Sequence, residues 1–403
     1  MTPVEDHLAD IAAAVRPLVP TELSVNDAYG LVLAEDVTAA SALPSFDNSA
    51  MDGYAVRVAD VASASEEHPV TLPVVAEVAA GDTGAYALQP GTSIRIMTGA
   101  MLPHGTEAVV PVEWTDGGQA RVAIRAKADF GQAVRLAGGD AKADEVLVTA
   151  GTRLRPMHIA VIAAAGRGTV LVRPRPRVVV LSTGSELAEP GTPIIPGRIW
   201  DSNSFMIAAA AREAGCLAYR QAIVPDNPEQ VLPAIEDQLA RADLLITTGG
   251  VSMGGEHDVV KAALQRLGTI AFRKVAMQPG MPQGFGTIAV APGERVPIFT
   301  LPGNPVSAYV SFQMFVRPAL AALQGTNDLS LPLVRATLTG PVRSPSGRRS
   351  YLRGVLDGTK VTPLSGQGSH QIAYLGKANA LIIVPEWETT LPANDTVDVL
   401  ILP

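Results

Sequence analysis

The sequence predicts a multidomain α/β and β protein, in which one α/β domain lies between regions of short strands. Three observations support this fold class. The chain has 403 residues, enough for two to four domains. Strand-like and helix-like segments alternate over about 150 residues from Arg177 onward. On both sides of that stretch, short apolar runs are separated by glycine and proline, as in β-rich domains.

The composition excludes two broad classes of protein. Apolar residues make up 47% of the chain and the net charge is only −8, whereas disordered chains combine low hydrophobicity with high net charge. Charged residues make up only 17%, and there are 37 glycines and 32 prolines, which excludes a coiled coil. The remaining class is a globular protein rich in turns.

Several features predict a cytoplasmic protein. The single cysteine, Cys216, cannot form an intramolecular disulfide, which favours a reducing compartment. The first residues are acidic and amphipathic, unlike a signal peptide, and we find no apolar run of about 18 residues, so we expect no membrane insertion. Residues 1–60 carry as much net negative charge as the whole chain, and without a strongly basic region we expect no nucleic-acid partner.

The N-terminal half is predicted to be mixed. Residues 4–18 are expected to form an amphipathic helix, because Leu8, Ile11, Val15 and Leu18 recur at helical spacing. Residues 70–136 contain short alternating runs and are predicted to be β-rich. A short helix is expected near residues 157–165.

The middle of the chain predicts a parallel sheet with helices on both faces. Strands are expected at 177–182, 216–224, 243–250, 269–277, 286–291 and 296–303. The helices expected between and after them are 202–215, 226–242, 258–268 and 304–323. Ligands of such sheets bind beyond the carboxyl ends of the strands. From about Leu329 the pattern returns to short strands, which predicts a small all-β domain at the C-terminus.

The segment DNSAMDGYAV places two carboxylates, Asp47 and Asp52, five residues apart in a region that favours turns. Such a turn can present carboxylates to a metal ion or to a proton-transfer site. The alternative is a connection in which the Asx side chains bind the local backbone. The residues alone leave both interpretations open.

The segment ITTGGVSMGGEHD follows a buried strand and contains Gly249, Gly250, Ser252 and Asp258. Glycine lets the backbone approach a ligand, successive amides can bind an anion, and the start of a helix adds a favourable dipole. The alternative is an ordinary tight turn between a strand and a helix that Asp258 caps.

Two further turns are expected at the same edge of the sheet. In TLPGNPVSA, Asn304 suits a helix cap and Pro305 suits the first helical position. The third turn is STGSE, residues 182–186. Together the three turns predict a pocket for an anionic, phosphorylated molecule. A P-loop motif is absent, and GFGTIA is followed by a strand where a dinucleotide site needs a helix.

Several motifs together resemble a known family. They are FDNSAMDGYAVR, SIRIMTGA, STGSEL, TTGGVS, LPGNPVSAYVSF and GQGSH, in this order over residues 45–370. The chain resembles the molybdopterin molybdenumtransferase family, which includes bacterial MoeA and the E domain of gephyrin. The combination is specific, although each motif alone is not.

The resemblance implies four domains. These are a linker domain (1–45 and 138–175), a β-rich domain inserted in it (46–137), a Rossmann-like three-layer α/β molybdopterin-binding domain (176–327) and a β-barrel-like C-terminal domain (328–403). It also implies an elongated homodimer. The active cleft would then lie between the α/β domain of one subunit and the inserted domain of the other.

The implied reaction inserts molybdate into adenylylated molybdopterin and releases AMP, with Mg²⁺ as the assisting cation. By motif, the residues expected in the catalytic cleft are Asp52, Thr98, Asp140, Glu186 and Asp258. Of these, Asp258 and Glu186 are expected to hold the metal. The residues expected to bind substrate are Arg135, Ser182, Thr183, Gly249, Gly250, Ser252, Pro302, Asn304, Pro305, Ser307, Arg353 and Ser369.

The chain also departs from the family pattern. Gly139 and Ser185 stand where relatives often have acids, and Gln278 and Met281 stand where bacterial relatives often have lysines. An extra glycine lengthens the loop at 252–258. These departures give an alternative hypothesis of a different class: a gephyrin-like dimeric scaffold with reduced catalysis. Such a scaffold would bind a peptide tail of a membrane receptor or cytoskeletal protein between its α/β and C-terminal domains.

Overall fold

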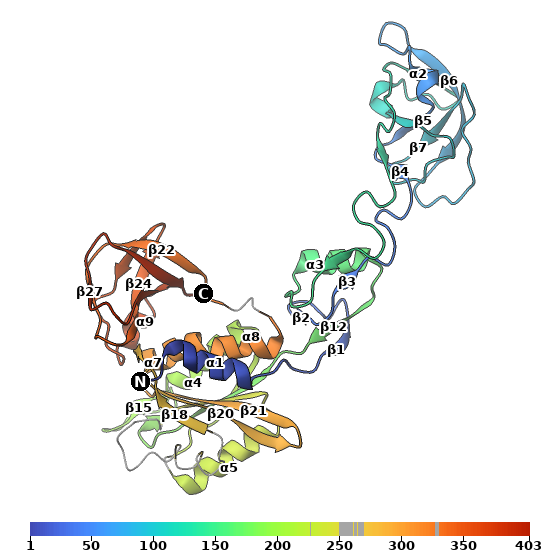
Figure 1. Ribbon diagram of the computed structural model, residues 1–403. Coiled ribbons are helices and arrows are strands. Elements are labelled where there is room, and N and C mark those ends of the chain that lie inside the picture. Colours follow the sequence, from blue (N-terminus) through green and yellow to red (C-terminus); the bar gives the residue numbers. More distant parts are fainter. Residues whose placement is uncertain (226, 250–260, 262–263, 265–269, 327–329) are drawn as a thin grey trace.

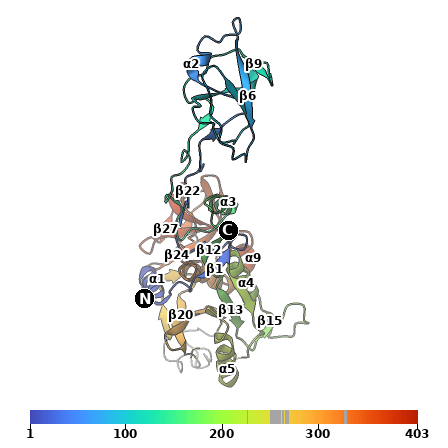
Figure 2. The same cartoon turned by 90° about the vertical axis from the view of Figure 1, so that its right-hand side faces the viewer.

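The computed structural model describes residues 1–225, 227–249, 261, 264, 270–326 and 330–403. Two views show an elongated molecule (Figures 1 and 2). A small β-rich domain forms one end, and the α/β domain forms the other. A slender linker with helix α3 joins them, and the C-terminal β domain packs on the α/β domain.

The inserted domain is built on a five-stranded sheet with the order β8-β5-β7-β6-β9. Its buried side chains form two apolar clusters, one on each face of the sheet, which include Tyr54 and Val110 on one face and Ile94 and Ile96 on the other. Its elements are β5 (Gly53–Val56), α2 (Val58–Val61), β6 (Val70–Val78), β7 (Ser93–Ile96), β8 (Ala108–Pro111), the 3₁₀ turn η1 (Val112–Trp114) and β9 (Arg121–Ile124).

Three small antiparallel sheets form the linker and its junction with the inserted domain. Strands β1, β12 and β2 form one sheet, β11 pairs with β3, and β10 pairs with β4. Helix α3 begins at Pro156 and ends at Ala164, within one residue of the predicted range at each end. The linker elements are β1 (Thr21–Ser24), β2 (Val32–Leu33), β3 (Val37–Thr38), β4 (Asn48–Ser49), β10 (Val134–Arg135), β11 (Val146–Val148), α3 (Pro156–Ala164) and β12 (Thr169–Arg173).

The α/β domain contains a six-stranded sheet with the order β16-β13-β17-β21-β20-β18. The first four strands are parallel, but β20 is antiparallel to β21 and β18 is antiparallel to β20. The expectation of a wholly parallel sheet was therefore wrong. Pro292 and Gly293 (φ +83°) form a tight turn between β20 and β21, so the two strands pair as a hairpin without a crossover helix. The strands are β13 (Arg177–Ser182), β16 (Leu217–Arg220), β17 (Leu244–Thr248), β18 (Ile270–Lys274), β20 (Pro282–Ala291) and β21 (Glu294–Leu301), and the small pair β14 (Leu187–Ala188) and β15 (Ile199–Trp200) lies beside them.

Helices cover both faces of this sheet, which makes three layers. Helix α5 packs on one face through Val231 and Ile235, and Figure 1 shows it on the side opposite α1, α4 and α8. The larger core lies on that other face, where Ile207 packs with Phe312 and Phe315. The helices are α4 (Asn203–Glu213), α5 (Pro228–Leu239), α7 (Pro305–Ser311) and α8 (Arg317–Gln324).

Helix α1 (Val4–Ala14) also belongs to this core, through Val4 and Ile11. It is four residues shorter than predicted, because Pro17 disfavours helical backbone at Arg16, and Val15 is already extended. Its His7 is 2% exposed and lies edge-on to Phe315, with ring centroids 4.7 Å apart.

Helices α7 and α8 are continuous through a π-helical turn, Phe312–Val316. In the part of the chain that the structure describes, Pro305–Gln324 is the one helix whose length and mean hydropathy would allow it to cross a membrane. However, 72% of it is buried within the protein, as in the core helix of a globular domain.

The C-terminal domain is a closed five-stranded barrel, because β24 pairs with both β25 and β26 and the circuit returns through β28 and β22. The predicted multidomain α/β and β fold is thus confirmed. Strand β19 (Met277–Gln278) from the α/β domain adds to β24 and joins the two domains. The barrel elements are β22 (Leu333–Leu338), β23 (Val342–Arg343), β24 (Arg349–Asp357), β25 (Lys360–Pro363), α9 (Ile372–Leu375), β26 (Ala380–Val384), β27 (Thr390–Leu391) and β28 (Thr396–Ile401).

Candidate functional site

Asp52 is an exposed carboxylate held in one orientation. Its Oδ1 accepts a hydrogen bond from the backbone N–H of Thr98 (2.7 Å) and another from the Thr98 hydroxyl (2.8 Å). These bonds, the backbone one first, lower the pKa of the Asp52 carboxyl below its ordinary value. Asp52 is therefore ionised at neutral pH and faces solvent at the start of β5.

Gly53 fixes the chain directly after Asp52. A Cβ atom on this residue would lie 2.0 Å from the carbonyl oxygen of Val110, on the neighbouring strand β8. Any side chain at position 53 would push the two strands apart and move Asp52. Glycine at this position is thus part of the local geometry that presents the carboxylate.

The other predicted residues of this region lie in the linker. Arg135 is exposed and pairs through β10 with Asn48 in β4. Asp140 is also exposed, and its backbone N–H donates to the carbonyl of Leu43 (2.9 Å). The Asp47 carboxylate instead accepts from the backbone N–H of Ala137 (2.7 Å). The Asp47 carboxylate thus binds backbone that is 90 residues away in the sequence, so it does not form the local Asx turn of the second interpretation.

The second region is the carboxyl edge of the six-stranded sheet. The buried hydroxyls of Ser182 and Thr248 are 3.0 Å apart at the ends of β13 and β17. Thr183 is buried, and its Oγ1 has no hydrogen-bond partner among the described residues. Gly249 has φ +95°, and a Cβ there would lie 2.6 Å from the Thr183 carbonyl oxygen. Two of the predicted turns therefore meet at this edge.

The third predicted turn lies at the same edge and contacts the barrel. The Asn304 side chain was expected to cap its helix, but its Nδ2 donates to Ser369 Oγ (3.0 Å), and it makes no cap bond. The Val306 N–H also reaches this loop and donates to the Ser369 carbonyl (3.1 Å). Pro305 opens α7 as predicted, Pro302 precedes the turn, and Ser307 is buried in the first turn of the helix.

Asn203, at the start of α4, is a residue that the sequence analysis missed. Its Nδ2 donates to the carbonyl of Gly303 (2.7 Å), which fixes the amide, and its buried Oδ1 accepts no hydrogen bond from any residue that the structure describes. Gly303 in turn packs against Gly249. A Cβ atom on Gly303 would lie 3.7 Å from the Gly249 Cα. In the sequence, Asn203 had only the pattern of a helix start, so nothing marked it as part of the site.

Arg353 lies behind the GQGSH loop. It is 1% exposed, and its guanidinium donates to the carbonyls of Gln371 (2.8 Å) and Gly368 (3.0 Å). Burial lowers its pKa. The structure places this cation under the backbone that carries Ser369. A direct contact of Arg353 with an anion stays a prediction.

Glu186 is exposed, and its carboxylate folds back over Gly184, where a Cβ would lie 2.6 Å from Oε2. The described residues contain no cluster of three or more potential metal-ligating side chains.

Three predicted residues, Gly250, Ser252 and Asp258, lie outside the described residues. Of the positions that depart from the family pattern, Gly139 and Ser185 are exposed, and Gln278 and Met281 are half-buried.

The predicted residues fall into two separate groups. We call them the linker group, which is Asp52, Thr98, Arg135 and Asp140, and the sheet-edge group, which is Ser182, Thr183, Glu186, Gly249, Pro302, Asn304, Pro305, Ser307 and Ser369. The linker group lies toward the inserted domain, and the sheet-edge group lies where the α/β domain meets the barrel (Figure 1). A single chain does not bring the two groups together.

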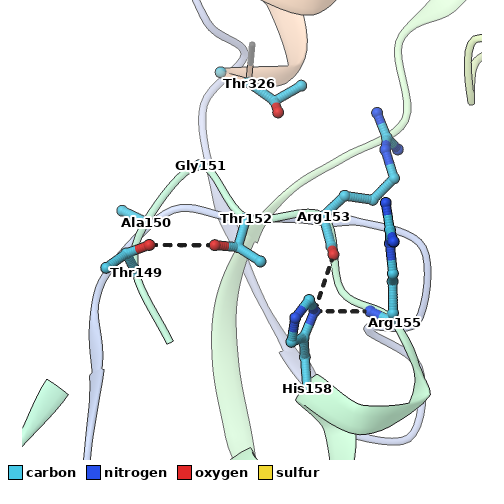
Figure 3. Close-up of a pocket in the computed structure, with 9 residues that line it drawn as sticks. Thr149, Ala150, Gly151, Thr152, Arg153, Arg155, His158 and Thr326 are labelled. Carbon is cyan, nitrogen blue, oxygen red and sulfur yellow. Dashed lines mark hydrogen bonds between the residues drawn. The ribbon is translucent and has the colours of Figure 1, made fainter. Parts of the chain in front are cut away.

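A cavity of about 670 Å³ lies elsewhere, where the linker meets the end of α8. Figure 3 shows Arg153 and Arg155 side by side on its wall, with His158 below them and Thr326 across from them. Arg153 donates to Gly30 O (2.9 Å) and Gln324 Oε1 (2.8 Å), which ties the linker to α8. The described lining contains none of the predicted site residues.

The fold and the sheet edge define a multidomain protein whose α/β domain presents polar side chains beyond the carboxyl ends of its parallel strands. Family models match the chain in three successive regions. Residues 2–166 match the MoeA N-terminal region (domains I and II), residues 179–322 match a probable molybdopterin-binding domain, and residues 335–402 match the MoeA C-terminal region (domain IV).

Whole-chain relatives agree. The chain is 45% identical to molybdopterin molybdenumtransferase 2 of Mycobacterium tuberculosis over 96% of both chains, and 34% identical to the molybdopterin molybdenumtransferase of Bacillus subtilis over 94% of this chain and 89% of that one. A crystal structure of the molybdopterin biosynthesis protein MoeA from Pyrococcus horikoshii covers 100% of this chain and 99% of its own, with 30% identity and a TM-score of 0.85. The chain belongs to the molybdopterin molybdenumtransferase family.

Proposed function

We propose that this protein is a transferase of molybdenum cofactor biosynthesis that inserts molybdate into adenylylated molybdopterin. Water splits the phosphoanhydride, AMP leaves, and molybdate binds to the dithiolene of molybdopterin. The observation that carries the proposal is the sheet edge. Polar residues from β13, β17 and α4 and the turn after β21 meet there, and Thr183 Oγ1 and Asn203 Oδ1 have no partner in the described part of the chain. Such an edge is where α/β sheets bind phosphorylated ligands.

Mg²⁺ would be held at the same edge. The donors there are carboxylate, hydroxyl and carbonyl oxygens, the hard ligands that Mg²⁺ prefers, and this ion is commonly held by one or two carboxylates together with substrate phosphates. Glu186 is the exposed carboxylate at this edge among the described residues, and Asp258 was predicted to be the second ligand. When bound, the ion offsets the negative charge of the phosphates.

The complete site requires a second copy of the chain in this proposal. The linker group supplies an ionised, oriented carboxylate, Asp52, and the sheet-edge group supplies the binding surface. Because the two groups lie apart in one chain, a homodimer in which the linker group of one subunit faces the sheet edge of the other would join them. Asp52 and Asp140 would then orient water or cations at the bound phosphates.

The scaffold hypothesis is less favoured. The named relatives that match the whole chain are transferases. The contact of Asn304 with Ser369 also joins the α/β domain to the barrel on the side where the peptide groove was expected. A peptide partner between these domains stays a prediction.

The test is direct. Purified protein is given adenylylated molybdopterin, Mg²⁺ and molybdate, and AMP is measured over time. We expect AMP release that depends on Mg²⁺ and that is lost in Glu186→Ala. If the folded protein releases no AMP above background, the proposed function is wrong.

A further inference from the structure

Arg348 lies beyond the carboxyl edge of the sheet, at the boundary between the α/β domain and the barrel. Strands β18 and β21 are both antiparallel to β20, so β18 ends at the same edge as the other parallel strands. The chain then passes through β19, whose Gln278 pairs with Ser350 at the start of β24. Arg348 precedes β24, and its Nη1 donates to Gln278 Oε1 at 3.4 Å.

The turn that contains Gln278 is fixed to the helix of the sheet-edge group. Gln283 Nε2 donates to the Gly280 carbonyl and to Ser311 Oγ, both at 2.6 Å, and Ser311 belongs to α7. Gly280 has φ +99°, and a Cβ there would lie 2.8 Å from Ser311 Oγ. Ser311 is the last residue of α7, and Asn304 is the residue directly before the helix. The turn is therefore fixed to the end of the helix whose start belongs to the sheet-edge group.

The charge of Arg348 is not neutralised by the described residues. The neighbouring Arg349 forms ion pairs with Glu5 and with Glu386 (3.2 Å), whereas Arg348 has no carboxylate within 4.0 Å in the described part of the chain. Arg348 is half-buried, so it is less hydrated than a fully exposed arginine. The turn itself has the neutral residues Gln278 and Met281, so Arg348 supplies a cation that the turn lacks.

We propose that Arg348 binds a tetrahedral oxyanion of the substrates, a phosphate or molybdate, from the barrel side of the sheet edge. A guanidinium can donate two parallel hydrogen bonds to such an oxyanion, and only one weak bond to Gln278 has to be exchanged for them. This inference rests on the proposed function. It adds a residue that none of the predicted site residues included.

The test compares Arg348→Gln with Arg343→Gln. Arg343 is an exposed arginine of the same domain, so both variants lose one positive charge. In steady-state AMP release, Arg348→Gln should raise KM about 10-fold and leave kcat within about twofold of the wild type. Arg343→Gln should change neither constant. A KM for Arg348→Gln equal to that of Arg343→Gln would overturn the inference.

A second variant moves the positive charge from Arg348 to position 278, its hydrogen-bond partner. Adding Gln278→Lys to Arg348→Gln should restore most of the lost affinity, because the ammonium replaces the guanidinium at this position. The conservative Arg348→Lys should give an intermediate KM, since it retains the positive charge but loses the two parallel N–H donors of the guanidinium. Failure of Gln278→Lys to improve KM would also count against the inference.

Equilibrium dialysis with molybdate alone and with AMP alone separates this inference from the proposed reaction. If the wild type releases no AMP, these two ligands still report on Arg348. Weaker retention of either ligand by Arg348→Gln supports the inference and identifies which oxyanion is bound. Equal retention of both ligands by wild type and variant overturns it.

Discussion

The linker group and the sheet-edge group differ in how their polar atoms are satisfied. Asp52 is exposed, and two hydrogen bonds from Thr98 hold it. At the sheet edge, Thr183 Oγ1 and Asn203 Oδ1 are buried and find no partner within the described ranges, as is true of the hydroxyls of Thr247 and Thr300 within β17 and β21. The first region is an oriented charge that needs no ligand to form, and the second is a surface whose polar atoms the described chain leaves unused. We therefore expect the linker group and the proposed metal ligand Glu186 to determine kcat, and the other residues of the sheet-edge group to determine KM.

The largest expected effect is on turnover. Asp52→Ala should lower kcat for AMP release by about 10²- to 10³-fold, because an oriented carboxylate near the reacting phosphate is lost. KM should change little. Asp47→Ala is a matched control in the same segment, because the Asp47 carboxylate accepts a hydrogen bond from the backbone N–H of Ala137. This variant should affect stability more than kcat. Equal loss of kcat in both variants would contradict the separate role of Asp52.

The next effect is on stability in acid, and it should be confined to the α/β domain. Burial, together with the nearby Arg273, lowers the pKa of His7 to about 4, whereas an unfolded chain titrates near 6.5. Between these values the unfolded state binds a proton that the folded state does not. Lowering the pH from about 6.5 to 4 should therefore cost up to about 3 kcal/mol of unfolding free energy.

Hydrogen exchange at pH 7 and pH 4.5 measures this effect region by region. Exchange is compared as protection relative to the intrinsic rate at each pH, because the intrinsic rate itself falls in acid. At pH 4.5 protection should fall in α1 and the strands beneath it, and it should change less in the inserted domain. His7→Phe should remove the difference. If both domains lose protection equally and the variant behaves like the wild type, another group controls the acid response.

A smaller effect is expected at the sheet edge. Asn203→Ala should raise KM about 10-fold with kcat nearly unchanged, because a buried acceptor is lost and Gly303 is no longer held. Asn203→Asp retains an acceptor but loses the donor to Gly303, so it reports which half of the amide matters. A fall in kcat at constant KM would break the proposed division between the two groups.

The smallest effect is expected at Cys216. Burial raises the pKa of its thiol to about 12, so it is almost entirely protonated at neutral pH. Neither group contains a cysteine. Iodoacetamide at pH 7.5 should therefore leave AMP release unchanged, and mass spectrometry should find Cys216 modified only after unfolding. Rapid inactivation with labelling of Cys216 would place this thiol near the reaction.

The sequence predicted most of the fold, because periodicity and turn residues act locally. The helices at 157–165, 202–215 and 304–323, and the β-rich regions on both sides, follow from such signals. The antiparallel direction of β20 was not predicted, and neither was the pairing of β18 with it, although Pro292 and Gly293 are residues typical of a hairpin turn. The end of α1 was also missed, although Pro17 marked it.

The site was predicted less completely, because its contacts join distant segments. Asp52 and the three turns at the sheet edge are visible as local motifs. The bond from Asn203 to Gly303 joins residues 100 positions apart, and the bond from Arg348 to Gln278 joins two domains. The burial of Arg353 depends on how the GQGSH loop folds over β24. Such contacts depend on tertiary packing and leave no local pattern in the sequence.

Mixing two inactive variants tests the central claim, that the linker group of one subunit completes the sheet edge of another. Asp52→Ala and Glu186→Ala chains are unfolded together and refolded, so that about half of the dimers contain one chain of each kind. Each mixed dimer would hold one intact site of two, so AMP release should recover to about a quarter of the wild-type rate. No recovery above the sum of the separate variants, with mixed dimers demonstrated by mass, would contradict the account.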